Sequence, residues 1–221
     1  MIHHRHIIIQ DYIISKLSNH FKSYRFISEE IPQQEHDISK PTWILDPIDG
    51  TGNFYRGLPD FTISLALAFD QKIHFGVIYA PILNKLYYVE RGKGAFVNDK
   101  KIHVSNVPTL RDSLLFLSSY NTFVSNKKEK AYNNLVKSIQ NNKISRSTAL
   151  DLCFVAEGCA EGRVLANTKI WDYAAGCLLI EEAAGRVTRW NNSTNYFGCS
   201  TIIATNGLIH DELLSKLNET K

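Results

Sequence analysis

Long apolar runs are missing from this sequence. The longest, residues 61–69, contains Thr62 and Ser64 and is far shorter than the roughly 20 residues that a bilayer span needs. The first residues also lack the apolar stretch and small-residue cleavage site of a secretory signal. These absences predict a cytoplasmic protein without a membrane partner.

Paired cysteines and a strong charge bias are missing as well. The four cysteines show neither a C-x-x-C pair nor zinc-site spacing, which favours free thiols in a reducing compartment. The net charge is only +3, and the densest basic patch, residues 127–130, is typical of a solvated helix face rather than a nucleic-acid surface. The hydrophobic content of 44% is enough for a packed core and excludes a disordered chain.

The 221 residues suit one large domain or two small ones, and no linker divides them. Apolar residues at a four-residue spacing (Ile9, Ile13, Leu17 and Phe21) predict a helix over 7–21. Strands separated by turn signals over 61–97 predict an antiparallel meander. Further strands are expected at 24–27, 43–45, 114–118, 164–165, 187–190 and 201–204, and further helices at 132–141, 149–157, 171–184 (closed by Gly185) and 209–217. The sequence therefore predicts one α+β or layered α/β domain over residues 1–221.

Acidic residues stand out at three places. Glu29 and Glu30 follow a predicted strand, Asp46 and Asp49 flank a Pro-Ile pair, and Asp172 lies where a helix begins. No cluster of histidine and cysteine accompanies them, and ligand sets made only of oxygen suit hard cations such as Mg²⁺. Each site alone also has an ordinary explanation: a solvated turn, an Asx turn and a helix cap, respectively.

The middle site has the best physical rationale. Pro47 is expected to keep Asp46 extended and to end the strand, so that the carboxylates of Asp46 and Asp49 converge across a turn. The glycines of Gly50-Thr51-Gly52 then allow backbone N–H groups to approach an anion. Together these residues predict a site for divalent cations and phosphate.

Three segments resemble the inositol monophosphatase family. Residues 43–54, WILDPIDGTGNF, are similar to its signature D-P-x-D-G-T-x-x-F, and residues 171–176, WDYAAG, are similar to W-D-x-A-A-G. Residues 26–30, FISEE, resemble its G-E-E strand end, with Ser28 in place of glycine. The resemblance covers nearly the whole chain and implies the layered α-β-α-β-α sandwich of the inositol monophosphatase and fructose-1,6-bisphosphatase type.

The resemblance implies a metal-ion site with a shared ligand. Glu29, Asp46 and the carbonyl of Ile48 would hold one Mg²⁺, and Asp46, Asp49 and Asp172 would hold a second. The expected cofactor is thus Mg²⁺, as two or three ions, with Mn²⁺ as a substitute.

The resemblance also implies the catalytic and substrate-binding groups. Thr51 and Glu29 would position the attacking water, while the amides of Gly50 and Thr51 would hold phosphate. Asp49 would contact a hydroxyl of the alcohol and counts among the catalytic residues. Substrate would therefore lie along Ile48, Asp49, Gly50 and Thr51.

Two departures from the family pattern concern the N-terminus and the substrate. The usual N-terminal helices are expected to be missing, and His6 occupies the position of an aspartate that ligates a third, weaker metal ion. A frayed terminus is the alternative for His6. Leu165 occupies the position of a glutamate that contacts ring hydroxyls in many relatives, so Asn167 or Lys169 would have to serve a different alcohol.

The function implied is hydrolysis of inositol monophosphate or a similar small phosphorylated alcohol. Two alternatives remain in the same superfamily, a 3′(2′),5′-bisphosphate nucleotidase and a sugar bisphosphatase. A third is a catalytically weakened accessory protein of transcription and ribosomal RNA synthesis, as in some bacterial members. The expected partners are the small phosphorylated substrate, a second copy in a homodimer, and the transcription machinery.

Overall fold

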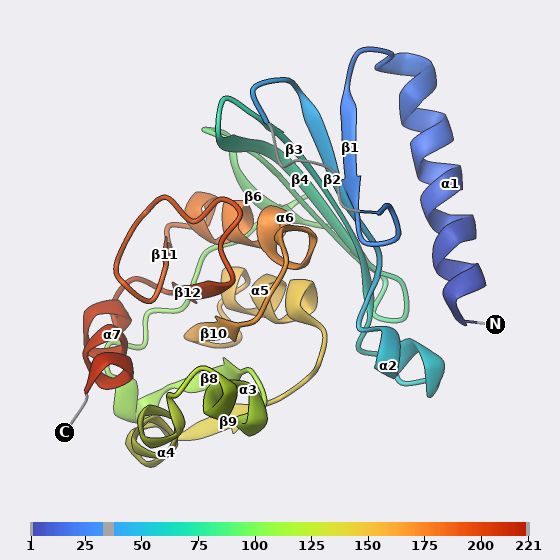
Figure 1. Cartoon of the computed structure of the whole chain (residues 1–221). Helices are drawn as coiled ribbons and strands as arrows, with labels where there is room; N and C mark the ends of the chain where they lie inside the picture. The colour runs from blue at the N-terminus through green and yellow to red at the C-terminus, as the bar shows by residue number, and fades with distance from the viewer. Residues whose placement is uncertain (1, 33–37, 220–221) are drawn as a thin grey trace.

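Five layers of secondary structure stack upon one another in the computed structural model (Figure 1), which describes residues 2–32 and 38–219. In order they are a helix, a seven-stranded sheet, a helix pair, a five-stranded sheet and a group of outer helices. This arrangement confirms the layered α-β-α-β-α sandwich expected from the sequence.

The larger sheet contains the first seven strands in chain order. Its first two strands are parallel, and each later strand is antiparallel to the one before it, so the predicted meander is confirmed. The strands are β1 (Arg25–Ser28), β2 (Thr42–Asp49), β3 (Thr62–Phe69), β4 (Lys72–Ala80), β5 (Lys85–Glu90), β6 (Gly94–Val97) and β7 (Lys100–Lys101).

The smaller sheet has the strand order β11-β12-β10-β8-β9. Strand β10 lies at its centre, parallel to β8 and antiparallel to β12. The strands are β8 (Leu114–Leu117), β9 (Asn141–Lys143), β10 (Gly162–Ala166), β11 (Arg186–Thr188) and β12 (Thr201–Thr205). Strand β9 is wholly exposed, which is why hydrophobic periodicity did not predict it.

Helices cover the outer faces of both sheets and fill the space between them (Figure 1). Helix α1 (Ile2–His20) packs on the outside of the larger sheet, and α5 (Thr148–Ala156) and α6 (Ile170–Glu182) lie between the sheets. The other helical elements are α2 (Thr51–Tyr55), η1 (Leu110–Asp112), α3 (Tyr120–Ser125), α4 (Glu129–Ser138) and α7 (His210–Asn218). None of the helices in the described part of the chain is long and apolar enough to cross a membrane.

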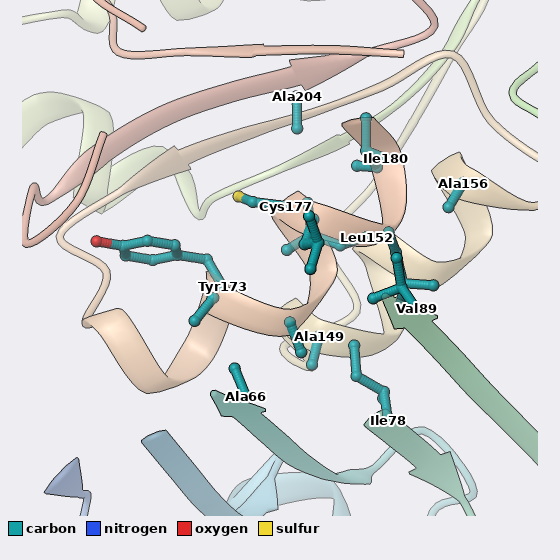
Figure 2. Packing of buried hydrophobic residues seen from close by; sticks show 14 of the residues in the cluster. Ala66, Ile78, Val89, Ala149, Leu152, Ala156, Tyr173, Cys177, Ile180 and Ala204 are labelled. Atoms are coloured by element: carbon teal, nitrogen blue, oxygen red, sulfur yellow. The ribbon is translucent and has the colours of Figure 1, made fainter. Parts of the chain in front are cut away.

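The main hydrophobic core lies around α5 and α6 (Figure 2). It joins Ala66, Ile78 and Val89 of the larger sheet to Leu152 of α5 and Ala204 of the smaller sheet. A second cluster lies beneath α3, α4 and α7 on the other face of the smaller sheet. The smaller sheet is thus covered on both faces, and α5 and α6 set the spacing between the two sheets.

Strand β2 continues through Pro47 instead of ending there. It runs to Asp49, and its register against β3 shifts between Asp46 and Asp49. Strand β1 pairs with β2 only as far as Leu45, so the missing N–H of Pro47 breaks no hydrogen bond to β1, and the bulge absorbs the change of register. The expectation that proline ends the strand was therefore wrong, and both aspartates belong to a strand.

The close of α6 also differs from the expectation at Gly185. The residue with a left-handed backbone is Ala184, at φ 70°, and the N–H of Gly185 donates to the carbonyl of Ile180 at 2.8 Å. Gly185 is required for a different reason, because a Cβ there would lie 2.5 Å from the carbonyl oxygen of Thr205. The glycine therefore permits close packing on β12 rather than supplying the turn.

The crossing of α5 and α6 gives a stability prediction. A Cβ at Gly176 would lie 2.6 Å from the Cβ of Leu152, so Gly176→Ala is expected to lower the free energy of unfolding by about 1–3 kcal/mol. Gly52→Ala is the matched helical control, because its nearest atom would be Arg56 Nη1 at 3.7 Å. Urea unfolding of both variants is the measurement, and equal stability of Gly176→Ala and the parent would contradict this packing.

Candidate functional site

Four carboxylates from three neighbouring elements lie near one another where β1, β2 and α6 meet. Ser28 pairs with Leu45 in parallel strands, so Glu29 follows beside Asp46. Asp49 ends β2, and α6 packs across this sheet with Asp172 in its first turn. The structure thus brings together the four acidic residues that the sequence singled out.

Burial and mutual repulsion dominate the electrostatics of Glu29 and Asp46. Burial raises the pKa of Glu29 to about 7, helped by repulsion from Asp172, Glu30 and Asp49 and opposed by a hydrogen bond with Asp46. Burial also raises the pKa of Asp46 well above its usual range, with repulsion from Asp49, Glu29 and Asp172 adding to it. The site therefore holds more negative charge than its surroundings neutralise.

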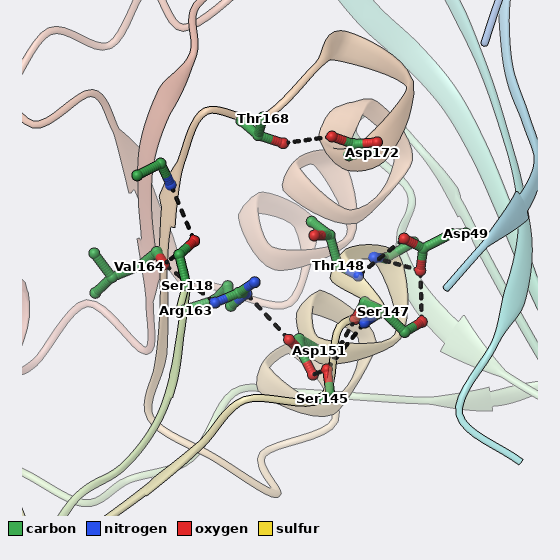
Figure 3. Close-up of polar contacts among 12 residues, drawn as sticks. Asp49, Ser118, Ser145, Ser147, Thr148, Asp151, Arg163, Val164, Thr168 and Asp172 are labelled. Atoms are coloured by element: carbon green, nitrogen blue, oxygen red, sulfur yellow. Dashed lines mark hydrogen bonds and ion pairs between the residues drawn. The ribbon is translucent and has the colours of Figure 1, made fainter. Parts of the chain in front are cut away.

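Asp49 accepts hydrogen bonds from four donors, and Figure 3 shows those from Ser147 and Thr148. Its Oδ2 accepts from Thr62 Oγ1 at 3.2 Å, Ser147 Oγ at 2.5 Å and the N–H of Ala149 at 3.0 Å. Its Oδ1 accepts from the N–H of Thr148 at 2.9 Å. Asp49 on the larger sheet therefore caps the N-terminus of α5. Its Oδ2 accepts three hydrogen bonds, whereas its Oδ1 accepts one.

Burial and hydrogen bonding act in opposite directions on the pKa values of Asp49 and Asp172. Burial raises the pKa of Asp49 to about 6, the donor Ser147 lowers it and Asp172 raises it. Burial raises the pKa of Asp172, while the N–H of Lys169 and the hydroxyl of Thr168 lower it. Both donate to Asp172 Oδ2, at 2.7 Å and 2.8 Å, and Figure 3 shows the bond from Thr168. Asp172 therefore caps its own helix.

The turn after β2 places the predicted phosphate-binding residues beside these carboxylates. Gly50 has φ 87°, and a Cβ there would lie 2.8 Å from the carbonyl oxygen of Asp60, so the turn requires glycine. The N–H of Ile48 donates to Asp46 Oδ1 at 3.0 Å. The hydroxyl of Thr51 donates to the carbonyl of Ile48 at 3.3 Å, which keeps both groups at this end of β2.

His6 belongs to the site, and the frayed-terminus interpretation was wrong. It lies within α1 and is only 3% exposed. Its Nδ1 is 3.0 Å from Glu30 Oε1 and 4.0 Å from Glu29 Oε2, and Nε2 is buried without a hydrogen-bond partner. Among the described residues, His6, Glu29 and Glu30 are the one group of three whose ligand atoms all lie within 4.8 Å.

Asp46, Asp49 and Asp172 are less tightly grouped than His6, Glu29 and Glu30. Asp49 is turned towards the start of α5 and Asp172 towards the start of its own helix, where each carboxylate is hydrogen bonded. Like charges in a buried place repel strongly, and this repulsion adds to burial in raising the pKa of Asp46. A donor set made almost entirely of carboxylate oxygens fits Mg²⁺, whose charge would offset it.

The residues expected to contact the alcohol lie in different surroundings. Leu165 is 1% exposed and belongs to the main core. Asn167 is hydrogen bonded to Ser125 and Asn126. Lys169 is exposed and borders a hollow of about 160 Å³ between β1 and the start of α6, so it is the better placed of the two polar candidates.

Sequence reasoning missed the polar residues beneath Asp49. Ser145 and Ser147 on the segment that enters α5, Asp151 within α5, and Arg163 on β10 form a polar group under the site, joined by hydrogen bonds and by the Arg163–Asp151 ion pair (Figure 3). No motif marks them. The one available signal is a charged Asp151 and a charged Arg163 inside stretches that are otherwise apolar.

Comparison with known proteins gives a consistent picture. The profile of the inositol monophosphatase family matches residues 6–221. The chain is 35% identical to a fructose-1,6-bisphosphatase/inositol-1-monophosphatase of Thermotoga maritima, over 95% of this chain and 79% of that one. It is 33% identical to a Nus factor SuhB of Pasteurella multocida, over 94% and 79% of the two chains. The solved extragenic suppressor protein suhB of Bartonella henselae superimposes with a TM-score of 0.89 at 33% identity, covering 98% of this chain and 84% of that one.

The raised pKa values predict how cation binding depends on pH. Glu29 and Asp49 have folded-state pKa values of about 7 and about 6, above their ordinary 4.5 and 3.8. The folded chain therefore holds protons that the unfolded chain releases, so the metal-free protein loses stability as the pH rises from about 4 to about 7. Excess Mg²⁺ is expected to raise the melting temperature more at about pH 8 than at about pH 5, because protons compete with it at the lower pH. An equal gain at both pH values in a thermal melt would contradict this.

Proposed function

Because the chain belongs to the inositol monophosphatase family, a family of metal-dependent phosphatases, we propose that it hydrolyses inositol monophosphate or a similar small phosphorylated alcohol. The observation that carries the proposal is the convergence of four carboxylates that repel one another, Asp46 and Asp49 buried, Asp172 half-buried and Glu29 at the exposed edge. Burying a carboxylate without a compensating positive charge costs folding free energy. Divalent cations bound at a phosphatase site would supply that positive charge.

The proposed ligand sets share Asp46. Glu29, Asp46 and the carbonyl of Ile48 would hold one Mg²⁺, and Asp46, Asp49 and Asp172 a second. When bound, such ions polarise phosphoryl oxygens and make water a stronger nucleophile at neutral pH.

A third ion is proposed at the His6 group. It would lie at His6, Glu29 and Glu30, whose ligand atoms are within 4.8 Å of one another. An imidazole nitrogen there favours Mn²⁺ over Mg²⁺ as the occupant.

The residues of the turn would orient the reacting groups. The hydroxyl of Thr51 and the carboxylate of Glu29 would position the attacking water, and the amides of Gly50 and Thr51 would hold phosphate oxygens. Asp49 would accept a hydrogen bond from the alcohol. The left-handed Gly50 supports this assignment, because the turn that carries these amides has no room for a side chain there: a Cβ would lie 2.8 Å from the carbonyl oxygen of Asp60.

The substrate is tested by a panel of phosphate esters. Inositol monophosphate is expected to be cleaved with Mg²⁺, and faster than fructose bisphosphate or a 3′,5′-bisphosphate nucleotide. Phosphate release at saturating Mg²⁺ is the measurement. A higher kcat/KM for the nucleotide or for the sugar bisphosphate would assign the chain to one of those alternatives instead.

The ligand assignment is tested by Asp46→Asn. Because Asp46 would bind both ions, this change is expected to lower kcat by at least about 1,000-fold, since it removes the charge that holds them. The metal-free variant is expected to melt no lower than the parent, since a buried repelling charge is lost. Asp11→Asn, an exposed carboxylate on α1, is the matched control and should keep full turnover. Near-parental turnover of Asp46→Asn would refute the assignment.

A second candidate function is contact with the transcription machinery. Relatives 33% identical to this chain bear the name Nus factor SuhB, which supports this role and the catalytically weakened alternative. One experiment separates the two functions. It measures whether the Asp46→Asn variant still co-purifies with RNA polymerase factors.

A homodimer is proposed as the working assembly, and its test is the mass of the protein in solution.

A further inference from the structure

We propose that the buried ion pair of Arg163 and Asp151 is a positioning element for Asp49, acting through Ser145 and Ser147. The inference rests on the proposed function, since it gives the pair a role in holding a cation ligand. Neither charged residue belongs to the family signatures found in the sequence, and neither faces solvent. The pair lies between the start of α5 and strand β10, directly beneath the site (Figure 3).

A continuous set of contacts runs from Arg163 to Asp49. Arg163 Nε lies 3.1 Å from Asp151 Oδ2, and Asp151 Oδ1 accepts from Ser145 Oγ at 2.5 Å. Ser145 Oγ in turn accepts from the N–H of Ser147 at 3.1 Å. The hydroxyl of Ser147 then donates to Asp49 Oδ2 at 2.5 Å. The first contact is an ion pair and the other three are hydrogen bonds, so the position of Asp151 constrains Ser145 and through it the backbone of Ser147.

The segment that carries the two serines is held from both sides. Asn53, on α2 next to the predicted phosphate loop, donates to the carbonyl of Ser145 at 2.8 Å, and it also donates to the carbonyl of Asp60 at 2.7 Å. Asp151 holds the same segment from within α5. Ser145 thus joins the phosphate loop, the start of α5 and the buried ion pair.

These contacts decide which oxygen of Asp49 can bind a cation. Oδ2 already accepts from three donors, whereas Oδ1 accepts only the N–H of Thr148. A carboxylate oxygen with one donor keeps capacity for a metal ion. Without the Ser147 hydroxyl, Oδ2 would lose its shortest hydrogen bond, and the carboxylate would be held less firmly by Thr62, Thr148 and Ala149.

Stability alone is a weak reason for the pair. Arg163 is 4% exposed and Asp151 0%, and a buried ion pair replaced by apolar residues of similar size often leaves stability unchanged or higher. Arg163 is also attracted to Asp49 and Asp172 as well as to Asp151. A costly pair kept directly under the carboxylates is best explained by the ligand that it orients.

The experiment compares the parent chain with Asp151→Leu/Arg163→Met. This double change removes the pair without altering the net charge and keeps the buried volume filled. The dissociation constant of Mn²⁺, measured by calorimetry, is expected to rise about 10-fold or more, in line with the effect of residues that orient metal ligands. The value of kcat at fixed Mg²⁺ is expected to fall while KM for the phosphate ester changes less than about 2-fold.

Two further variants keep the test decisive. Ser145→Ala breaks the link between the ion pair and Ser147 without touching any charge, and should weaken Mn²⁺ binding in the same direction. Lys85→Met/Glu157→Leu removes a second ion pair, with a 2.7 Å contact, at the other end of α5. This control is expected to change the melting temperature only, with parental Mn²⁺ affinity and kcat.

The outcomes separate the positioning role from the proposed function. Parental Mn²⁺ affinity in both Asp151→Leu/Arg163→Met and Ser145→Ala would overturn the positioning role and leave the phosphatase proposal standing. If the double variant fails to fold, Ser145→Ala alone decides. A parent chain that binds Mn²⁺ but releases no phosphate would contradict the proposed function, with the positioning role still judged by affinity. A parent chain that binds no Mn²⁺ would overturn both.

Discussion

The carboxylate of Asp49 joins the larger sheet to the helix layer behind it, and the site depends on that junction. Its four hydrogen-bond donors come from β3 and from the start of α5. Asp46, which is buried, and Glu29, which is partly exposed, lie beside it, and repulsion among the carboxylates adds to the effect of burial on the pKa of both. The same junction places α5 against α6, which carries Asp172. Packing therefore holds carboxylates together that repel one another, and divalent cations are the partners that we propose for them.

The sequence predicted the layered fold and the four carboxylates because both leave local signals. Alternating apolar residues predicted the meander, and two ordered signatures marked Asp46, Asp49 and Asp172. Pro47 was misinterpreted because a proline ends most strands, whereas here β1 stops at Ser28 and a bulge takes up the change of register. Strand β9 left no signal, since all three of its residues are exposed.

Long-range contacts were beyond what the sequence could predict. His6 meets Glu30 across 24 positions of the chain, and Ser147 meets Asp49 across 98. Neither pair shares a motif, and both depend on how whole layers pack. His6 and Leu165 also depart from the family pattern described above: an imidazole lies beside Glu29 and Glu30, and an apolar core residue stands where a ring contact was expected.

The most direct test of the central claim is to locate cations in crystals of the protein grown with Mn²⁺, using anomalous scattering. The account predicts peaks within bonding distance of Asp46, one shared with Glu29 and the Ile48 carbonyl and one shared with Asp49 and Asp172. Both peaks should disappear in crystals of Asp46→Asn. Mn²⁺ bound elsewhere, with no anomalous density at Asp46, would contradict the claim that these carboxylates form the metal centre.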